Sequence, residues 1–585
     1  MQILKKFLFL LNNHERKRVS ILLVMILIMA LLDMIGVASI LPFIAVLTDP
    51  GIVETNMILR QMYHISNIFG VENNQQFLFT LGIFVFLVLV ISLVFKAITT
   101  YVMVLFVQML EYSICKRLVQ GYLTQPYTWF LNRNSADLGK TILSEVSQLV
   151  GNGIRPLMEL ISKGTIAIII IILLIIVNPK LALIIGLLLG GAYGLIFYFI
   201  KNFLIKIGKA RLKNNESRFT VLSEVFGAAK EVKLGGLEET YIKRFSGYAH
   251  NTARYHSLSQ VLGELPRYLL EAVAFGGILL MILLLLQTGS FNNVLPIISL
   301  YVFAGYRLMP ALQNIYSSFT KITFVGPSLN KLYDDIKGFK TFNKNKDQDI
   351  LILEKKITLK NICYDYPNSS RTALRDININ IPAKHTIGLI GSTGSGKTTT
   401  VDIILGLLEA QKGNLEIDGK TITKNNCRAW QRSLGYVPQH IYLADDTIEA
   451  NIAFGSTPEE IDQEAVEKSA KIANLYEFVV NELPEKFQTK VGERGIRLSG
   501  GQRQRIGIAR ALYHKPQVLI LDEATSALDN ETEKAVMDAV NNLSKDITII
   551  LIAHRLNTVK NCDIIFKLDK GQLKEQGTFD EIVKK

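Results

Sequence analysis

The chain has 585 residues, of which 49% are hydrophobic and only 20% are charged, and its formal net charge is +13. This balance excludes a disordered chain, which would have few apolar residues and many charges. A basic excess in an apolar protein indicates either nucleic-acid binding or membrane spans with basic cytosolic loops, and the positions of the apolar residues distinguish the two.

The apolar residues are concentrated in the first 320 residues, in runs long enough to cross a hydrocarbon core about 30 Å thick. One of these runs, 166–177, contains no polar residue. A soluble core helix would have a polar back, so six helices that are apolar all round predict a membrane domain over residues 1–330. The predicted spans are 21–47, 77–110, 158–178, 181–203, 268–287 and 294–318.

Lys and Arg residues lie on alternate connections between these spans. The N-terminal segment and two further connections carry 23 of them, whereas the intervening connections carry only Arg60 and Lys180. By the positive-inside rule, the N-terminus and everything after the sixth span are predicted to be cytosolic. The first span lacks a small-residue cleavage site, so we expect it to be retained and not removed as a signal peptide.

Three basic residues, Lys96, Arg267 and Arg307, fall within or at the start of predicted spans, where charges are costly and are functional candidates. In one interpretation Lys96 and Arg267 extend to the cytosolic interface, Arg267 pairs with Glu271, and Arg307 pairs with Asp33 or a carbonyl. In the other, the three cations line a cavity and bind an anionic head group such as a phosphate or diphosphate. The second interpretation is slightly favoured.

Residues 331–349 are polar and charged and are predicted to be a linker. From residue 350 to 585, short β-rich runs alternate with helical segments, which predicts one α/β domain with a largely parallel sheet.

The first chemical motif of this domain follows the strand 386–390 and fits G-x-x-x-x-G-K-[ST], with a helix expected after it. Its backbone N–H groups and the helix N-terminus would surround the phosphates of ATP. Lys397 would reach the β- and γ-phosphates, and the Thr398 hydroxyl would ligate Mg²⁺. The predicted nucleotide-binding residues here are Gly391, Ser392, Thr393, Gly394, Ser395, Gly396, Lys397, Thr398 and Thr399.

The second motif is the apolar strand 518–521, which ends in Asp522 and Glu523. A strand that delivers an Asp to its carboxyl end can place that carboxylate beside Mg²⁺. Glu523 would then be positioned to activate the attacking water as a general base.

Just before this strand stands Leu498-Ser499-Gly500-Gly501-Gln502, and with it the chain resembles ATP-binding cassette (ABC) transporters along essentially its whole length. The resemblance implies that Tyr366 stacks on adenine, that Gln439 contacts Mg²⁺ and water, that Asp529 lies in a loop communicating across a dimer, and that His554 contacts the γ-phosphate. The resemblance gives catalytic roles to Gln439, Glu523 and His554. It gives the role of metal ligand to Thr398, Gln439 and Asp522.

In this family ATP is bound between two cassettes, with residues 391–398 of one facing Ser499, Gly500, Gly501 and Gln502 of the other. The chain has one cassette and six predicted spans, which is half of such a transporter, so the resemblance implies a dimer, and a homodimer is favoured because every expected catalytic residue is present. The segment 492–495 resembles an exporter-type loop, and 122–130 and 224–236 resemble the two coupling segments of exporters.

Segments 265–271 and 306–310 are similar to parts of bacterial flippases that translocate polyprenyl-diphosphate-linked oligosaccharides. The same resemblance implies an amphipathic outer helix at about 52–69, a location in the bacterial cytoplasmic membrane, and an anionic lipid as cargo for protein glycosylation or surface-polymer assembly. Lys96 departs from the arginine expected there, and so loses the bidentate fork. Two alternatives to the flippase function stay open: an exporter of other lipids, drugs or peptides, and a nucleotide-gated regulator. A nucleic-acid ATPase is disfavoured, because no basic, aromatic-rich segment lies outside the membrane loops.

Overall fold

The computed structural model consists of two compact units, described separately below. The first is formed by Met1–Gln125 and Trp129–Phe342, and the second by Pro126–Thr128 and Asn343–Lys585. The residues described are those outside 1, 49, 68–70, 72, 178, 289–290, 340–348, 368–371, 493–494, 525–529, 544–545, 554–555 and 584–585; some residues of the membrane helices, Arg307 among them, are described by their backbone alone.

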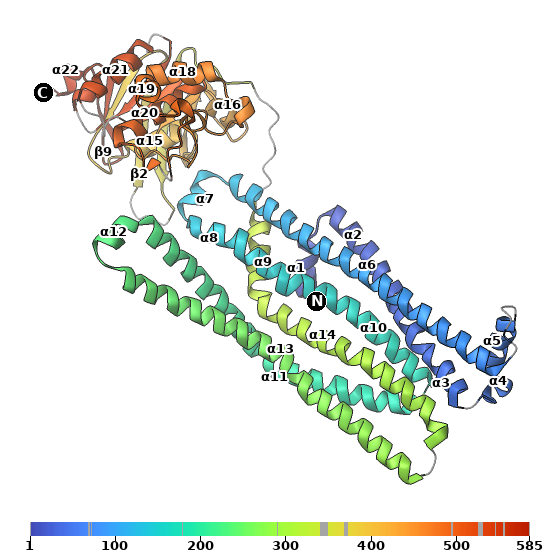
Figure 1. Cartoon of the computed structure of the whole chain (residues 1–585). Coiled ribbons are helices and arrows are strands. Elements are labelled where there is room, and N and C mark those ends of the chain that lie inside the picture. The colour runs from blue at the N-terminus through green and yellow to red at the C-terminus, as the bar shows by residue number, and fades with distance from the viewer. Residues whose placement is uncertain are drawn as a thin grey trace. The chain divides into compact units, whose positions relative to one another are not determined.

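The first unit is helical (Figure 1). Its helices are α1 (Gln2–Leu10), α2 (Asn13–Ala38), α3 (Ile40–Thr48), α4 (Ile52–Thr55), α5 (Met57–Asn67), α6 (Asn74–Leu123), α7 (Tyr127–Leu131), α8 (Ser135–Lys140), α9 (Val146–Leu149), α10 (Arg155–Val177), α11 (Pro179–Gly227), α12 (Ala229–Leu234), α13 (Glu238–Thr288) and α14 (Phe291–Gly338). Two π-helical turns, η1 (Thr141–Glu145) and η2 (Val150–Ile154), join α8, α9 and α10 into one path.

The six predicted spans lie on these helices: the first on α2 and α3, and the others on α6, α10, α11, α13 and α14. Within the described residues, three segments are long and apolar enough to cross a membrane, Asn13–Thr48, Asn74–Leu123 and Ser135–Val177. The 50 residues of α6 correspond to about 75 Å of helix, more than twice the hydrocarbon thickness. These helices must therefore continue well outside the membrane.

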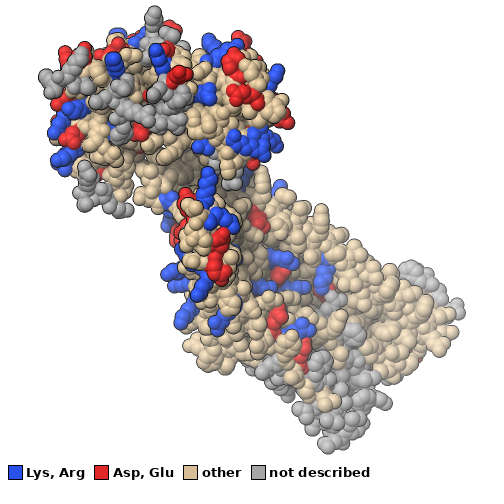
Figure 2. Space-filling view, turned by 60° about the vertical axis from the view of Figure 1, so that its left-hand side comes forward, with Lys and Arg blue, Asp and Glu red and all other residues tan. Residues whose placement is uncertain are grey.

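Charged and apolar side chains are separated along the unit. Figure 2 shows its Lys, Arg, Asp and Glu side chains gathered on one part of the face in view, beside a broad area without those colours. The largest buried apolar cluster joins α1, α6, α9, α10 and α14 through residues such as Leu10, Ile114 and Leu149, each 0% exposed. Apolar packing therefore continues beyond the predicted spans.

Two segments differ in detail from the sequence expectation. The first span is divided into α2 and α3, because Pro42 has no N–H for the bond that would continue the helix from residue 38. The expected outer helix at about 52–69 is two short helices, α4 and α5, separated by Asn56. Asn56 has an extended backbone, and its side chain accepts a bond of 3.0 Å from the Ile58 N–H, which caps α5. Residues 68 and 69 lie outside the described residues.

The expected linker is partly helical. α14 continues to Gly338, and Leu332 is 0% exposed against the cluster of the first unit. Residues 340–348 are outside the described part of the chain, and the domain boundaries stay predictions.

The second unit is an α/β domain with two sheets (Figure 1). Its strands are β1 (Lys356–Asp365), β2 (Thr372–Pro382), β3 (Thr386–Ile390), β4 (Lys412–Ile417), β5 (Lys420–Thr421), β6 (Leu434–Val437), β7 (Val518–Asp522), β8 (Thr548–Ile552), β9 (Ile564–Asp569) and β10 (Gln572–Gly577). Its helices are α15 (Lys397–Ile404), α16 (Cys427–Gln431), α17 (Ile448–Ile452), α18 (Gln463–Ile472), α19 (Tyr476–Glu482), α20 (Gly500–Tyr513), α21 (Asn530–Leu543) and α22 (Phe579–Val583).

The six-stranded sheet has the order β10-β9-β3-β8-β7-β6, in which every neighbouring pair except β10 and β9 is parallel. Strands β3, β7 and β8 are buried at every position, which explains their continuous apolar sequences. The predicted parallel sheet is thus present. The sequence did not predict the second sheet, in which β2-β1-β4-β5 are antiparallel.

Candidate functional site

The parallel sheet brings the predicted nucleotide-site motifs to one edge. Strands β3, β8, β7 and β6 are consecutive parallel neighbours, so their carboxyl ends lie together. The loop 391–396 follows β3, Asp522 ends β7, and Gln439 follows β6 by two residues. The topology therefore assembles segments more than 100 residues apart in sequence.

The loop 391–396 requires glycine at two close approaches. Gly391 has φ +151°, and a side chain there would come within 2.2 Å of the Leu568 carbonyl. Gly396 has φ +104°, and a side chain there would meet Leu374 at 2.7 Å. The hairpin between β9 and β10 also contacts the loop, because the Gly571 N–H donates to the Ser395 carbonyl at 3.0 Å. The loop is thus held by the sheet and hairpin around it.

The Lys397 side chain folds back over this loop. Its Nζ donates to the carbonyls of Gly391 at 2.8 Å and Ser392 at 3.1 Å, and the residue is 5% exposed. Burial lowers the pKa of the ammonium, although Glu523 and Asp522 nearby act in the opposite direction. Lys397 therefore lies within electrostatic reach of both acidic residues of the second motif.

The two threonines after Lys397 point to different surroundings. Thr398 is exposed, as a metal or phosphate contact requires. Thr399 is buried, and its hydroxyl is 3.1 Å from the Tyr366 hydroxyl. Tyr366 is half-buried, and its ring stacks edge-on against Tyr364 with centroids 5.2 Å apart. In this conformation Thr399 positions the tyrosine expected to contact adenine.

The carboxylates of the site have distinct environments. Asp522 is 7% exposed and accepts a weak bond of 3.5 Å from the Tyr436 hydroxyl. Asp402 on α15 is nearby, and burial together with the charge of Asp522 raises its pKa to about 6. Burial and these carboxylates also raise the pKa of Tyr436. The cluster of Asp402, Tyr436 and Asp522 therefore concentrates negative charge that a cation would relieve.

Glu523 has a strained backbone, with φ +50°, a conformation uncommon for any residue but glycine. Its N–H donates to the Ile552 carbonyl of β8 at 3.1 Å, and its Oε2 accepts a bond of 2.8 Å from Gln439 Nε2. Strand β8 and the segment after β6 thus hold Glu523 in place. Strain of this kind is concentrated at functional sites.

The segment Ser499–Gln502 forms the N-terminus of α20. Ser499 Oγ accepts from the Gln502 N–H at 3.2 Å, while Gln502 Oε1 accepts from the Ser499 N–H at 2.8 Å, forming a capping box. Gly500 and Gly501 occupy the first helical turn between them. The motif therefore presents the positive end of a 14-residue helix.

Two predicted site residues, Asp529 and His554, lie outside the described residues, as do residues 493–494 of the exporter-type loop. The structure also adds residues that sequence reasoning missed. Tyr436 and Asp402 were not singled out, although Tyr436 stands three residues before Gln439 and Asp402 is an isolated acid in the apolar helix after the glycine loop. These two positions, close to the recognised motifs, are the sequence signals that could have identified both residues.

Lys96 and Arg267, the two proposed head-group cations whose side chains are described, have local partners. Lys96 Nζ on α6 lies 3.6 Å from Asp33 Oδ2 on α2, and Ser92 Oγ donates to Asp33 Oδ1 at 2.9 Å. On α13, Arg267 Nε pairs with Glu271 Oε1 at 2.5 Å, and both side chains are partly exposed. Lys96 is thus one partner of Asp33, and the expected pairing of Arg307 stays a prediction. The side chain of Arg307 lies outside the described residues.

Two cavities occur between the described helices of this unit. One, of about 270 Å³, is lined by glycines of α11, by Tyr193 and Phe197, and by α14 residues including Tyr316 and Phe319. The rings of Tyr193 and Tyr316 are 5.1 Å apart, and Arg267 and Glu271 are electrostatic neighbours of Tyr193. This aromatic cavity therefore adjoins a charged pair.

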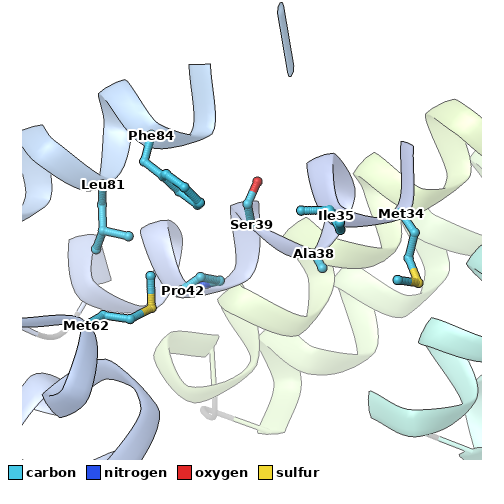
Figure 3. A pocket seen from close by; sticks show the side chains of 8 residues that line it. All are labelled: Met34, Ile35, Ala38, Ser39, Pro42, Met62, Leu81 and Phe84. Carbon is cyan, nitrogen blue, oxygen red and sulfur yellow. The ribbon is translucent and has the colours of Figure 1, made fainter. Parts of the chain in front are cut away.

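The other cavity, of about 260 Å³, is apolar and lies between α2, α3, α5 and α6. Figure 3 shows Leu81 and Phe84 of α6 facing Ser39 and Pro42, with Met62 of α5 beside them. The cavity therefore joins the first two spans to the predicted outer loop.

Comparisons with known proteins agree with both units. Residues 374–526 match the ABC transporter family, and residues 54–255 match the ABC transporter transmembrane region. The ATP-dependent lipid A-core flippase of Cupriavidus pinatubonensis is 31% identical over 464 residues, which cover 78% of this chain and 77% of that protein. The flippase of the same name from Saccharophagus degradans is 31% identical over 468 residues, with the same coverage, and that of Escherichia coli is 28% identical over 481 residues.

Among solved structures, a bacterial Atm1-family ABC exporter with ATP bound superposes with a TM-score of 0.75 at 22% identity, covering 98% of this chain and 97% of that one. This likeness establishes an exporter-type fold, as the sequence predicted. The chain belongs to the ABC transporter family, with a transmembrane region fused to an ATP-binding domain whose ATP hydrolysis is coupled to transport.

Proposed function

We propose that the protein is an ATP-driven lipid flippase that moves an amphipathic anionic lipid across the bacterial cytoplasmic membrane, with its N-terminus and ATPase domain in the cytosol. The observation that carries this proposal is the 31% identity over 78% of the chain to proteins named lipid flippases. The charge asymmetry of the connections, 23 basic residues against 2, supports the orientation.

For hydrolysis, we assign the general base to Glu523, oriented by Gln439, and the γ-phosphate contact to His554. Residues 391–399 and Tyr366 would hold the nucleotide, and Lys397 would leave the loop carbonyls for phosphate oxygens. Ser499, Gly500, Gly501, Gln502 and Asp529 of a second copy would complete the site, so the working form would be a homodimer. The helix N-terminus at Ser499 suits a phosphate because its N–H groups and dipole favour negative charge.

The residues proposed for Mg²⁺ fit that ion. Thr398 offers an exposed hydroxyl, Gln439 an amide oxygen and Asp522 a carboxylate in a cluster with excess negative charge. Hard oxygen donors of this kind suit Mg²⁺, which neutralises phosphate charge when bound.

For the cargo, we propose a lipid with a phosphate-bearing head group, specifically a polyprenyl-diphosphate-linked oligosaccharide. Support comes from the aromatic cavity between α11 and α14, which adjoins the partly exposed Arg267 and so offers apolar surface next to a guanidinium. Lys96 and Arg307 are the other proposed head-group contacts. Both described cations are already paired, Lys96 with Asp33 and Arg267 with Glu271. Arg267 is the better supported because it adjoins the aromatic cavity and its side chain is more exposed, 50% against 30%. The apolar cavity at Met62 would suit a hydrocarbon chain.

The test is translocation in proteoliposomes with and without ATP, comparing a fluorescent polyprenyl-diphosphate glycan, a lipid A-core lipid and a neutral lipid of similar size. We expect ATP-dependent transfer of the diphosphate glycan. Neutralising Arg307 or Arg267 should abolish this transfer while basal ATP hydrolysis largely persists. Preferred transfer of the lipid A-core lipid would replace the oligosaccharide assignment, and transfer that is equal for the neutral lipid would contradict an anionic head-group site.

A further inference from the structure

The first helix of the chain is too short to cross a membrane. α1 has nine residues, fewer than half of the about 20 that a span requires. It ends at Leu10, and α2 starts after Asn12, whose N–H donates to Glu15 Oε2 at 2.6 Å in a capping box. α1 and the first turns of α2 therefore form a defined corner directly before the first span.

One face of α1 is attached to the rest of the unit. Phe7 and Leu10 are 5% and 0% exposed in the cluster shared with α6 and α14. Lys6 Nζ donates to Asn330 Oδ1 at 2.7 Å and lies 4.9 Å from the centre of the Tyr333 ring. These contacts to α14 orient α1, so its remaining residues face outward in a definite direction.

The outward part of this corner is both apolar and basic. Residues 2–18 contain five Lys or Arg and one acidic residue, Glu15, whose carboxylate is occupied in the α2 cap. Four of the basic side chains, Lys5, Arg16, Lys17 and Arg18, are exposed, and of these Arg16 donates to the Leu8 carbonyl at 3.1 Å. The exposed apolar side chains, each 41–47% exposed, are Ile3, Leu4, Leu8 and Phe9.

We propose that α1 and the first turns of α2 form a binding surface for anionic lipid head groups of the leaflet next to the N-terminus. A short helix with exposed apolar side chains and Lys or Arg beside them binds at the membrane interface, with its apolar face among the acyl chains. A negatively charged leaflet attracts each such cation. The net charge of +4 over residues 2–18 supplies the complementarity, and the attachment to α14 holds the surface in its binding orientation.

The test compares full-length protein in nanodiscs of phosphatidylcholine and phosphatidylethanolamine with nanodiscs that also contain phosphatidylglycerol. Hydrogen–deuterium exchange of peptides covering residues 2–18 is the readout. We expect exchange roughly threefold slower or more in the anionic discs. The variant Lys5→Gln/Lys17→Gln/Arg18→Gln should lose this lipid dependence while the peptides of α6 and α20 keep their protection, which shows that it is folded.

The matched control is Lys213→Gln/Lys243→Gln/Arg254→Gln, which removes three exposed cations of the same unit outside the predicted spans. This control should retain the full lipid dependence. Equal exchange of residues 2–18 in the two kinds of disc, or loss of the dependence in the control as well, would overturn the proposal. The measurement uses neither ATP nor cargo, and both faces of a nanodisc are accessible, so its result is independent of the flippase assignment and of the orientation.

Discussion

Glu523 has a strained backbone and a side chain that accepts a hydrogen bond from Gln439. A substitution that keeps this hydrogen bond but removes the carboxylate can therefore test the proposed chemical role of Glu523 apart from its structural role. Glu523→Gln keeps the size of the side chain and an oxygen that can accept the bond from Gln439. It removes the carboxylate that would take a proton from water. We expect ATP hydrolysis to fall by roughly 10²-fold or more, while the affinity for a fluorescent ATP analogue changes by less than about threefold.

The matched control for this variant is Glu531→Gln, an exposed residue of α21 in the same domain. It should hydrolyse ATP at the wild-type rate. Normal turnover by Glu523→Gln would contradict the assignment of the base.

The raised pKa of Asp402 can be tested through the pH dependence of stability, since Asp402 lies beside Asp522 at the nucleotide site. Burial and Asp522 raise its pKa to about 6, from an ordinary value of 3.8 that applies in the unfolded chain. The folded protein therefore holds the proton more tightly, so this group favours folding below about pH 4, and the contribution is lost as the pH rises through 6. In nucleotide-free protein at pH 7.5, Asp402→Asn should raise the Tm by about 2–4 °C.

This gain should decrease as the pH is lowered towards 4.5, because wild-type Asp402 then becomes neutral as well. Thermal unfolding followed by intrinsic fluorescence measures both conditions. The exposed Asp445→Asn is the control for removing one negative charge, and its effect should not follow this pH profile. A gain from Asp402→Asn that is the same at both pH values would contradict the raised pKa.

For individual residues, the sequence could predict which residue types stand at the nucleotide site. Gly391 and Lys397 belong to one short motif and Asp522 to another, and each motif is continuous in the sequence. It could not predict how they are supported. The approach of Leu568 to Gly391, the bond from Gly571 to Ser395 and the Tyr436 contact all join segments far apart in sequence. Such contacts depend on the strand order, which no local pattern encodes.

Among the elements, the path α8–α10 contains two π-helical turns and carries a buried ionic network. Glu145, at the end of η1, receives two bonds from Arg211 on α11, at 3.1 and 3.0 Å, and one of 2.7 Å each from Ser328 and Asn215. Glu145 and Arg211 are 0% and 1% exposed. Sequence periodicity could predict this helix but not its π turns. These turns shift the register of the helix, and the shift brings Glu145 into the network.

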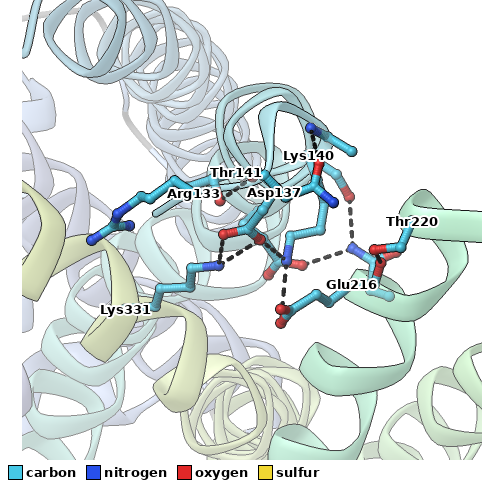
Figure 4. A network of polar contacts seen from close by, with 12 residues as sticks. Arg133, Asp137, Lys140, Thr141, Glu216, Thr220 and Lys331 are labelled. Atoms are coloured by element: carbon cyan, nitrogen blue, oxygen red, sulfur yellow. Dashed lines mark hydrogen bonds and ion pairs between the residues drawn. The ribbon is translucent and has the colours of Figure 1, made fainter. Parts of the chain in front are cut away.

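A neighbouring part of the network involves Lys140, which is also fully buried. Figure 4 shows it between Asp137 and Glu216, at 2.6 and 3.7 Å, with Lys331 of α14 on the other side of Asp137. Three helical paths, α8–α10, α11 and α14, therefore meet through charges outside the predicted spans. Burying so many charges is costly unless every partner is retained.

Arg211→Met tests this dependence, since it leaves Glu145 buried without its cation. We expect a loss of about 3–5 kcal/mol in stability, seen as a clear decrease in Tm. Combining it with Glu145→Gln should recover part of the loss, because the uncompensated charge is then removed. The exposed pair Lys233–Glu238 is the control, and Lys233→Met should leave the Tm unchanged. A double variant less stable than Arg211→Met alone would contradict this account.

For the whole molecule, the ATP site is proposed to be shared between two chains, with residues 391–398 of one facing Ser499 of the other. The capping box at Ser499 presents a helix N-terminus, which favours an anionic group such as a phosphate held by the other chain, so each chain would supply half of two sites. The family and the exporter fold could be predicted from the order of the motifs. The dimer could not be observed in one chain, and it requires a test in which two chains differ.

Purified heterodimers carrying two different tags provide that test. In the first heterodimer, one chain carries Lys397→Ala and the other carries Ser499→Arg. If the sites are shared, this heterodimer keeps one intact site, because the unaltered loop 391–398 of the Ser499→Arg chain faces the unaltered Ser499 of the Lys397→Ala chain. The other pairs wild type with the double variant Lys397→Ala/Ser499→Arg and keeps none, since each site contains one altered half. We expect about half of wild-type ATP hydrolysis from the first heterodimer and almost none from the second. Sites contained within single chains would give the opposite result, with activity only where one chain is entirely wild type, so the two arrangements are distinguished by which heterodimer hydrolyses ATP.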